Sequence, residues 1–344
     1  MPARRQTFGG HRVLLLYKDY WYDYPQYALM SHLTRNFANI RLLRFSSEER
    51  PRGRPIASSP KLFRAIEAWR PTLVVTYNNL LTLAEAEKIR SAGIQIASFI
   101  NGIHSFFSGA ATTQPEAFRI FKLYNCYLVP HAPHIAKLRE EGVEAFELPF
   151  WNDPEWFHPL ANVGKKYDLL FVGDFGTILN RNRAELLRIL AEKYHVAVAS
   201  DRKPDHERIT HIGRTDDPIQ LNRWFNQARV VIGSDRLGDT STLNSIPDQY
   251  IKYEDEFFIR ERVYLALGAG CCYVTDDHPE IRRKFEDGRE IVLWDDPSQL
   301  MDKVEMLLRD PARASRTGRD AARRCQLEHS TARRVQEILK ILAA

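Results

Sequence analysis

The chain has 344 residues, of which 44% are hydrophobic and 27% are charged, a balance typical of soluble globular proteins rather than of disordered or fibrous chains. This length predicts two domains of ordinary size, and the net charge of +5 is compatible with an anionic substrate without by itself indicating nucleic acid. No apolar run reaches about 18 residues, so the sequence predicts no membrane span. The apolar run near the N-terminus lacks a cleavage site of small residues and is predicted to be a first strand rather than a signal peptide.

Short apolar runs alternate with helical patterns through the first half of the chain. The predicted strands are 12–17, 40–45, 72–77, 94–100 and 124–130, and the predicted helices are 27–37, 60–69, 82–92 and 134–142. Strands that alternate with helices predict a parallel sheet covered on both faces. The densest basic stretch, at 49–56, is rich in proline and glycine and is predicted to be a solvated loop.

The alternation stops at 148–166, where prolines and large aromatic residues give the composition of a linker. It then restarts, with predicted strands at 167–173, 195–200 and 228–234 and predicted helices near 182–193, 217–227 and 296–310. The sequence therefore predicts two doubly wound α/β domains that face each other across a cleft. Because ligands of such sheets bind beyond the carboxyl ends of the strands, we expect two substrates, one for each domain.

The cysteines and two of the histidines give no sign of a metal centre. Cys126, Cys271, Cys272 and Cys325 form no CxxC pair, so we expect four free thiols in a reducing cytoplasm. His131 and His134 lie three residues apart with no carboxylate or thiol beside them in the sequence, and we expect them to have a capping or surface role.

A glycine-rich turn follows the predicted strand 167–173. It contains Gly173, Asp174, Phe175 and Gly176, and Arg181 and Arg183 stand near the start of the next helix. Glycines at a strand-to-helix turn let the backbone approach a phosphate or a sugar closely. The turn matches neither GxGxxG nor a P-loop, so an ordinary tight turn stays open as an alternative.

Two arginines stand near the start of another predicted helix. If the helix begins at the acidic residues 254–256, Arg260 and Arg262 lie one turn inside it and are solvated. If it begins near Phe258, both lie in the first turn, where a positive charge is unfavourable unless an anion binds. A diphosphate at this position would meet both backbone N–H groups and guanidinium groups. Local sequence leaves both interpretations open.

The last part of the chain resembles the end of GT-B glycosyltransferases, and it is most similar to the branch of the spore-coat CgeB-like proteins. The features that carry the resemblance lie in order over 262–339, and they are Arg262, Tyr264, Gly268, Gly270, Asp276, FEDGREIVLW, LLRDPARA, and His329 with Arg333 and Arg334. The phrase ELPFWNDPEWFHP also resembles the domain junction of that family. The first half of the chain matches only in its layout of strands and helices.

The resemblance implies a GT-B fold of two Rossmann-like domains. It implies an acceptor-binding domain at 1–158, a nucleotide-sugar domain at 159–329 and a C-terminal helix at 330–344 that packs back toward the first domain. The implied activity is transfer of a sugar from a nucleoside-diphosphate sugar to an acceptor hydroxyl. The expected donor-binding residues are Gly173, Asp174, Phe175, Gly176, Arg181, Arg214, Tyr250, Arg260, Arg262 and Tyr264, with Tyr253 as a further candidate to pack on the base.

No Asp-x-Asp motif occurs, and GT-A glycosyltransferases use that motif to hold a metal ion on the diphosphate. We therefore expect a metal-independent reaction without a cofactor, in which arginines and a helix dipole stabilise the leaving group. One position departs from the family pattern, because many GT-B enzymes have a glutamate for the ribose hydroxyls where this chain has Leu265. Three explanations of this departure stay open: another group holds the ribose, the donor is unusual, or the chain has lost activity.

The expected acceptor side follows the first and fourth strands. Tyr20, Trp21, Tyr22 and Tyr24 offer rings for stacking on a sugar or a base, although packing on the domain below is an alternative. If the reaction inverts the anomeric centre, Asp19, Asp23 or His104 would take the proton of the acceptor hydroxyl, although a structural role is an alternative for His104.

The acceptor itself is open between a glycan, a small molecule and a modified nucleic acid. One rival function is a glycosyltransferase that acts on modified bases of DNA, for which the basic loop and the tyrosine cluster would contact the strand. The other rival is a non-catalytic binding protein of the same fold, which Leu265 motivates because a fold does not fix a function.

Overall fold

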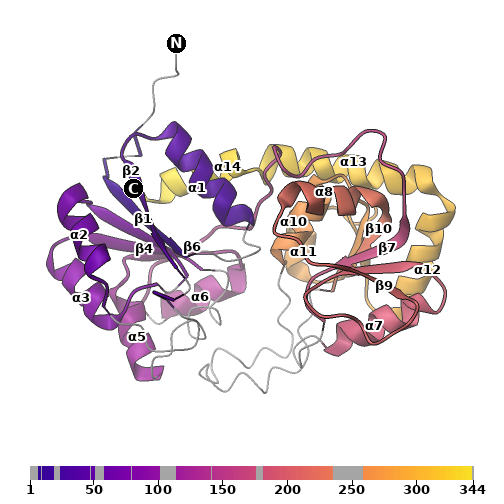
Figure 1. Cartoon of the computed structure of the whole chain (residues 1–344), viewed down its shortest axis with the longest axis horizontal. Helices are drawn as coiled ribbons and strands as arrows, with labels where there is room; N and C mark the ends of the chain where they lie inside the picture. The colour runs from indigo at the N-terminus through magenta and orange to yellow at the C-terminus, as the bar shows by residue number, and fades with distance from the viewer. Residues whose placement is uncertain are drawn as a thin grey trace, which may run out of the picture. The chain divides into compact units, whose positions relative to one another are not determined.

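The computed structural model describes residues 7–8, 10–18, 24–46, 48–50, 58–78, 80–100, 114–140, 142–175, 181–234 and 259–342. In these residues the chain forms two six-stranded sheets, each with helices packed against it (Figure 1). The strand pairings within these two sheets are parallel, which confirms the predicted α/β class with two doubly wound sheets. No helix among these residues is long and apolar enough to cross a membrane.

The first sheet has the strand order β2-β1-β3-β4-β5-β6. Its strands are β1 (Val13–Lys18), β2 (Ile40–Phe45), β3 (Leu73–Tyr77), β4 (Gln95–Phe99), β5 (Cys126–Val129) and β6 (Ala145–Glu147). Its helices are α1 (Tyr24–Asn36), α2 (Pro60–Trp69), α3 (Leu83–Ser91), α5 (Gln114–Leu123) and α6 (Ala132–Glu140). The central strands are runs of aliphatic residues because helices cover both faces of a parallel sheet.

The chain leaves β1 toward β2 on one side and continues through β3 on the other side. The strand order therefore changes direction between β1 and β3, which is the position where doubly wound sheets bind ligands. Asn78 follows β3 with a φ of 58°, a left-handed conformation that few residues other than glycine adopt. The hydroxyls of Thr76 and Ser98 fix this bend by donating to the Asn78 carbonyl at 2.9 and 3.2 Å.

The second sheet has the order β12-β11-β10-β7-β8-β9. Its strands are β7 (Tyr167–Val172), β8 (Val196–Ala199), β9 (Ile209–Gly213), β10 (Ala228–Ile232), β11 (Tyr273–Asp276) and β12 (Val292–Trp294). Its helices are α7 (Arg181–Ala191), α8 (Pro218–Gln227), α10 (Glu261–Gly268), α11 (Pro279–Lys284), α12 (Pro297–Arg309) and α13 (Pro311–Glu328). Here the strand order changes direction between β7 and β10.

The described residues divide into two compact units. Those up to Pro149 and those from Arg334 onward form the first unit, and Phe150 to Arg333 form the second. The change of unit thus falls at 149–150, whereas the sequence predicts 158–159. The stretch after Pro149 is not a loose linker, because Trp151 and Phe157 are buried and Phe157 packs edge-on against Phe225.

Two segments far apart in sequence lie side by side within the second unit. Asn152 pairs with Ser330 in a parallel bridge, its N–H donates to the His329 carbonyl at 2.8 Å, and its carbonyl accepts from Thr331 at 2.9 Å. Gly268 lies against the Asn152 side chain, where a Cβ atom would come within 1.9 Å of the amide nitrogen. This contact requires glycine at position 268.

The last helix, α14 (Thr331–Leu342), contributes to the first unit from Arg334 onward. Its apolar residues Val335, Ile338 and Leu342 are buried, as the helical spacing of these residues requires. Arg334 is also buried, and its Nε donates to the Pro149 carbonyl at 2.8 Å.

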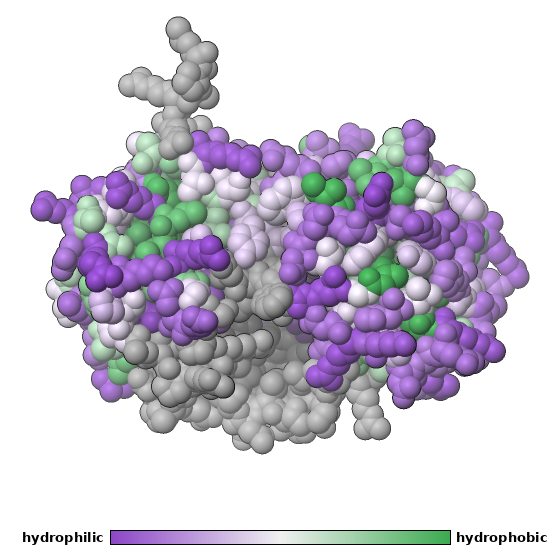
Figure 2. Space-filling view, in the orientation of Figure 1, coloured by the Kyte–Doolittle hydropathy of each residue, from purple (hydrophilic) through white to green (hydrophobic). Residues whose placement is uncertain are grey.

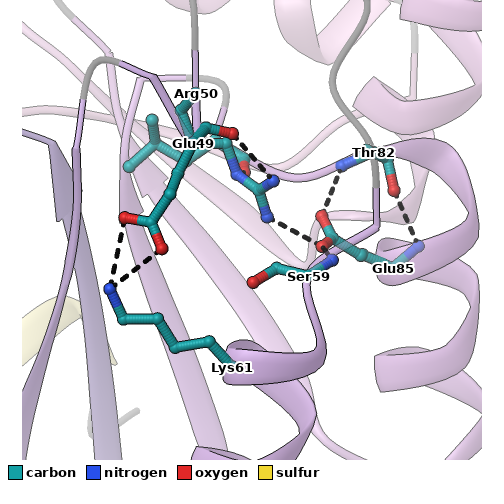
Figure 3. Close-up of polar contacts among 7 residues, drawn as sticks. Glu49, Arg50, Ser59, Lys61, Thr82 and Glu85 are labelled. Carbon is teal, nitrogen blue, oxygen red and sulfur yellow. Dashed lines mark hydrogen bonds and ion pairs between the residues drawn. The ribbon is translucent and has the colours of Figure 1, made fainter.

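A buried ion pair in the first unit corrects the prediction for the basic stretch at 49–56. Arg50 is 2% exposed and its Nη2 lies 2.7 Å from a carboxylate oxygen of Glu85, which has no exposed surface (Figure 3). Glu85 also accepts from the backbone N–H groups of Ser59 and Thr82, at 2.7 and 2.9 Å. The Arg50 Nε donates to the Leu80 carbonyl at 3.0 Å, so the start of this stretch is anchored rather than solvated.

Beside it lies a second ion pair that water reaches. Lys61 contacts Glu49 at 3.1 Å, and the two side chains are 41% and 37% exposed (Figure 3). The Ser46 backbone N–H, which donates to Glu49, holds the pKa of this carboxyl below its ordinary value, with a smaller contribution from Lys61.

Candidate functional site

A glycine, Gly173, follows the carboxyl end of β7 at the point where the strand order of the second sheet changes direction. Gly173 follows β7 with a φ of 137°, a conformation that favours glycine. A Cβ atom at this residue would lie 2.8 Å from Nη1 of Arg262. The glycine therefore lets the Arg262 guanidinium come close to the backbone of the turn.

Two arginines converge at this position from two different helices. Nη2 of Arg262 donates to the backbone carbonyl of Ser234 at 2.7 Å, and Nε of Arg183 donates to the same carbonyl at 3.1 Å. Nη1 of Arg183 also donates to the Asp174 carbonyl at 2.9 Å. Since Ser234 follows β10 and Asp174 follows β7, both guanidinium groups lie at the carboxyl ends of the two central strands.

Hydrogen bonds to backbone carbonyls hold both guanidinium groups. Arg262 also lies over the ring of Phe171, with the guanidinium carbon 5.5 Å from the ring centre, and Arg183 is buried. Packing and hydrogen bonds thus fix both side chains in place. Two fixed guanidinium groups at the carboxyl ends of parallel strands form a site suited to a diphosphate.

The start of α10 distinguishes between the two interpretations of its arginines. The helix begins at Glu261, Arg260 occupies the N-cap position with extended backbone, and Arg262 is the second helical residue. Arg262 therefore lies in the first turn, where an anion would be favoured by both the guanidinium and the helix dipole.

The structure separates two other predicted donor residues from this pair. Arg214 follows the edge strand β9 and forms ion pairs with Asp201 at 2.8 Å and with Asp216 at 3.0 Å. Tyr264 has almost no exposed surface, and its ring packs against Phe285 and His329, with centroid distances of 5.6 and 5.2 Å. Neither residue supports the predicted role, because two carboxylates already neutralise Arg214 and core packing encloses the Tyr264 ring.

Only part of the glycine-rich turn is accessible to a ligand. Asp174 is exposed, whereas Phe175 is buried in the core of the second sheet, so its ring supports the turn rather than a donor. Leu265, at the position where many GT-B enzymes have glutamate, is also buried, at 3% exposure. An apolar side chain thus packs into the core at that position.

On the acceptor side the structure describes one of the predicted aromatic residues. Tyr24 is the first residue of α1, and its ring is buried, so it supports packing rather than stacking on a ligand. Arg181 begins α7, and its side chain is not described. The remaining predictions lie outside the described residues, and they are Asp19, Asp23, His104, Tyr20, Trp21, Tyr22, Gly176, Tyr250 and Tyr253.

The histidines and cysteines for which no metal-binding role was predicted are mostly core residues. His131 and His134 are buried and pack edge-to-face with centroids 5.4 Å apart, which corrects the expected surface role. Burial raises the pKa of Cys271 and of Cys272 to about 12, so neither thiol ionises near neutral pH. Among the residues that the structure describes, no three or more His, Cys, Asp or Glu side chains are grouped as metal ligands.

Arg183 was not among the predicted donor residues, although it stands two positions after Arg181 at the start of the same helix. Residues two apart on a helix point about 200° from each other, so at most one of them could face the turn. Which one does so depends on the packing of α7 against the sheet, which local sequence does not reveal.

Comparison with known proteins agrees with the fold. The family described as "Glycosyl transferase-like" matches residues 181–340. A search of curated proteins finds no match. Sucrose-phosphate synthase from Thermosynechococcus elongatus has a similar structure, with a TM-score of 0.66 at 12% identity, covering 96% of this chain and 98% of that one.

Two further solved structures have the same fold. HepE from Anabaena, solved in complex with UDP, has a TM-score of 0.62 at 9% identity and covers 96% of this chain and 99% of its own. A glycosyltransferase from Rickettsia africae has a TM-score of 0.63 at 9% identity, with coverages of 96% and 98%. The architecture is therefore GT-B. Residues 181–340 match the glycosyl transferase-like family, and the CgeB-like branch stays a prediction.

Proposed function

We propose that the protein transfers a sugar from a nucleoside-diphosphate sugar to an acceptor hydroxyl, with the diphosphate bound by Arg183 and Arg262. The observation that carries the proposal is the convergence of both guanidinium groups on the Ser234 carbonyl, beside the turn at Gly173. HepE, which has a similar fold, was solved with UDP and with UDP-glucose, which supports a nucleotide-sugar donor.

The reaction needs help where negative charge develops. The acceptor oxygen forms a bond to the anomeric carbon, the bond from that carbon to the diphosphate oxygen breaks, and its electron pair stays on the diphosphate. Two fixed guanidinium groups and the N-terminus of α10 stabilise this charge without reorganising during the reaction. The proton of the acceptor hydroxyl passes to a base, for which Asp19, Asp23 and His104 stay the candidates.

We propose that this site works without a metal ion, because the arginine pair supplies the positive charge that a metal supplies elsewhere. Because Leu265 offers no oxygen to the ribose, the nucleoside must be held by other groups of the second unit. We also propose a cytoplasmic location, as the sequence predicts, for this protein that would use a nucleotide sugar.

Calorimetric titration of the full-length protein with UDP tests the donor site. A charge-assisted hydrogen bond contributes about 1.5–3 kcal/mol, so Arg262→Ala should weaken UDP binding about tenfold or more. Arg183→Met should have an effect of similar size. Arg214→Ala is the matched control, since its two carboxylate partners keep its charge from the ligand.

Arg262→Lys should restore affinity only in part, because an ammonium group is a point charge and cannot make two parallel bonds to one phosphate. Unchanged UDP affinity in both Arg262→Ala and Arg183→Met would refute the proposed donor site. A loss in Arg214→Ala as large as in those variants would show that net charge rather than this geometry decides binding.

A second candidate, transfer to modified bases of DNA, is favoured by the distribution of charge. Residues 1–149 contain 19 Lys and Arg against 12 Asp and Glu, whereas residues 150–344 contain 30 against 32. A basic acceptor half suits an anionic acceptor. Binding of a DNA duplex to the UDP-saturated protein should then fall steeply as salt rises, and weak binding without salt dependence would exclude this candidate.

A further inference from the structure

An exposed row of arginines runs along the longest helix of the second unit. Arg316, Arg319, Arg323 and Leu327 of α13 are spaced by three and four residues, so they lie on one side of the helix, and all four are exposed. We call these four residues the arginine stripe. The helix runs along the border of the second unit in Figure 1, and the surface of that unit in this view is mostly hydrophilic (Figure 2).

The opposite side of α13 fixes the orientation of the stripe. Ala314, Ala321 and Cys325 are buried, and at Gly318 a Cβ atom would lie 2.1 Å from the Gly270 carbonyl oxygen. Such close contact leaves the helix no room to rotate. The arginine stripe therefore faces outward as a fixed feature of the folded protein.

Four other arginines on the helices of this unit are paired with carboxylates on the same helix. The pairs three or four residues apart are Arg188 with Glu185, Arg283 with Glu280, Arg309 with Glu305, and Arg324 with Glu328. Within the part of the chain that the structure describes, none of the three arginines of the stripe pairs with a carboxylate. Arg319 donates instead to the Ser315 hydroxyl at 2.7 Å.

The charge of α13 stands out against its surroundings. The helix contains five arginines, no lysine and two acidic residues, whereas residues 150–344 as a whole carry slightly more acidic than basic residues. Its two acidic residues have other arginines beside them, since Asp320 lies 3.8 Å from Arg289 and Glu328 lies 2.7 Å from Arg324. Positive charge is thus concentrated on one exposed line.

Leu327 completes the stripe and points to the kind of partner. It is 64% exposed, and among the described residues only Leu327 and Ile219 are exposed large hydrophobic residues. A surface that combines guanidinium groups with an apolar side chain suits an anionic bilayer, where phosphates meet the arginines and a leucine reaches the acyl boundary. Nucleic acid would engage the arginines but would give the leucine no apolar environment.

We propose that the arginine stripe docks the protein on a membrane surface that contains anionic lipid. Each arginine near such a surface strengthens partitioning by roughly fivefold, so three together contribute roughly a hundredfold. The attraction is electrostatic and should weaken as salt rises, because the Debye length shortens. The docking is independent of the donor site, since none of the four residues contacts Arg183 or Arg262 in the bonds described above.

Sedimentation of the full-length protein with vesicles tests the proposal. One set of vesicles contains phosphatidylcholine and phosphatidylglycerol in equal parts, and the other contains phosphatidylcholine alone. The triple variant Arg316→Gln, Arg319→Gln, Arg323→Gln should lose binding to the anionic vesicles by roughly a hundredfold. Its UDP affinity should stay that of the parent protein, and Leu327→Asn should lose a smaller part of the binding.

The matched control removes three positive charges from another exposed region of the same unit. It is the triple variant Arg188→Gln, Lys193→Gln, Arg208→Gln, whose side chains are about half exposed in the parent. The control should bind anionic vesicles nearly as well as the parent protein. Equal losses in both triple variants, equal binding to both kinds of vesicle, or tighter binding to a DNA duplex than to anionic vesicles would overturn the proposal.

Discussion

The buried ion pair between Arg50 and Glu85 predicts a large and specific loss of stability in the first unit. One carboxylate of Glu85 joins three segments, since it accepts from Arg50, from the Ser59 backbone and from the Thr82 backbone. Removal of the carboxylate leaves a buried guanidinium group and two partly buried N–H groups without this acceptor. Each is costly to bury without an acceptor.

The expected magnitude follows from this burial. Removal of one partner from a buried ion pair costs about 3–5 kcal/mol, because the remaining charge stays out of water. Glu85→Ala should therefore lower the free energy of unfolding of the first unit by about 3–5 kcal/mol. Glu85→Gln keeps one oxygen acceptor, so its loss in free energy of unfolding should lie near the lower end of that range.

The neighbouring exposed pair supplies the control. Glu49 and Lys61 lie in the same cluster, but both side chains are more than a third exposed, so Glu49→Gln should cost about 0.2–1 kcal/mol. Hydrogen exchange measured on peptides of β1 and β3 reports the opening free energy of the first sheet in all three variants. A double variant, Arg50→Met with Glu85→Gln, should lose less than the sum of the two single losses, because it leaves no unpaired charge.

A loss in Glu85→Gln no larger than that in Glu49→Gln would refute this reasoning. It would mean that water or another group compensates Arg50 when the carboxylate is gone. Strictly additive losses in the double variant would show that the two residues act separately, despite their separation of 2.7 Å.

Two further predictions concern the second unit. Burial lowers the pKa of His278 from 6.5 to about 4, and its Nδ1 accepts from the Ile281 N–H as the N-cap of α11. The unfolded chain binds this proton more readily, so the free energy of unfolding should fall as pH drops from about 6.5 toward 4. The variant His278→Asn should flatten that pH dependence while keeping the N-cap, and urea unfolding at several pH values measures it. Gly268→Ala should cost about 1–3 kcal/mol in the same assay, because its Cβ would overlap the Asn152 side chain, and an unchanged midpoint would contradict that contact.

The sequence was sufficient to predict the architecture because hydrophobic patterning is a local signal. Alternation of apolar runs with helical periods predicted most strands and helices, and both sheets follow from that alternation. Short or polar elements such as β6, β9 and α5 carry a weaker pattern and were not predicted. The composition of 148–166 predicted a linker, yet its aromatic residues fill the core of the second unit, which only the tertiary structure shows.

The candidate site could be predicted only in part, and Tyr264 shows why. The family resemblance transferred Arg262 and Tyr264 together, although two residues that are two apart on a helix point to nearly opposite sides. With Arg262 turned toward Ser234, Tyr264 must turn into the core, and the structure places it there. Helical geometry was therefore a signal, available in the sequence, that could have separated the two residues.

Arg50 and Arg183 lack such a signal, because their roles depend on partners that are remote in the sequence. Glu85 follows Arg50 by 35 residues, and Ser234 follows Arg183 by 51. In both cases an arginine becomes buried because the tertiary structure brings an acceptor that is remote in the sequence next to it. The same strand order that brings Asp174 and Ser234 together at β7 and β10 also brings Lys18 and Asn78 to the ends of β1 and β3. The change of direction in the first sheet is thus where the acceptor should be sought, directly before the predicted acceptor residues that follow β1.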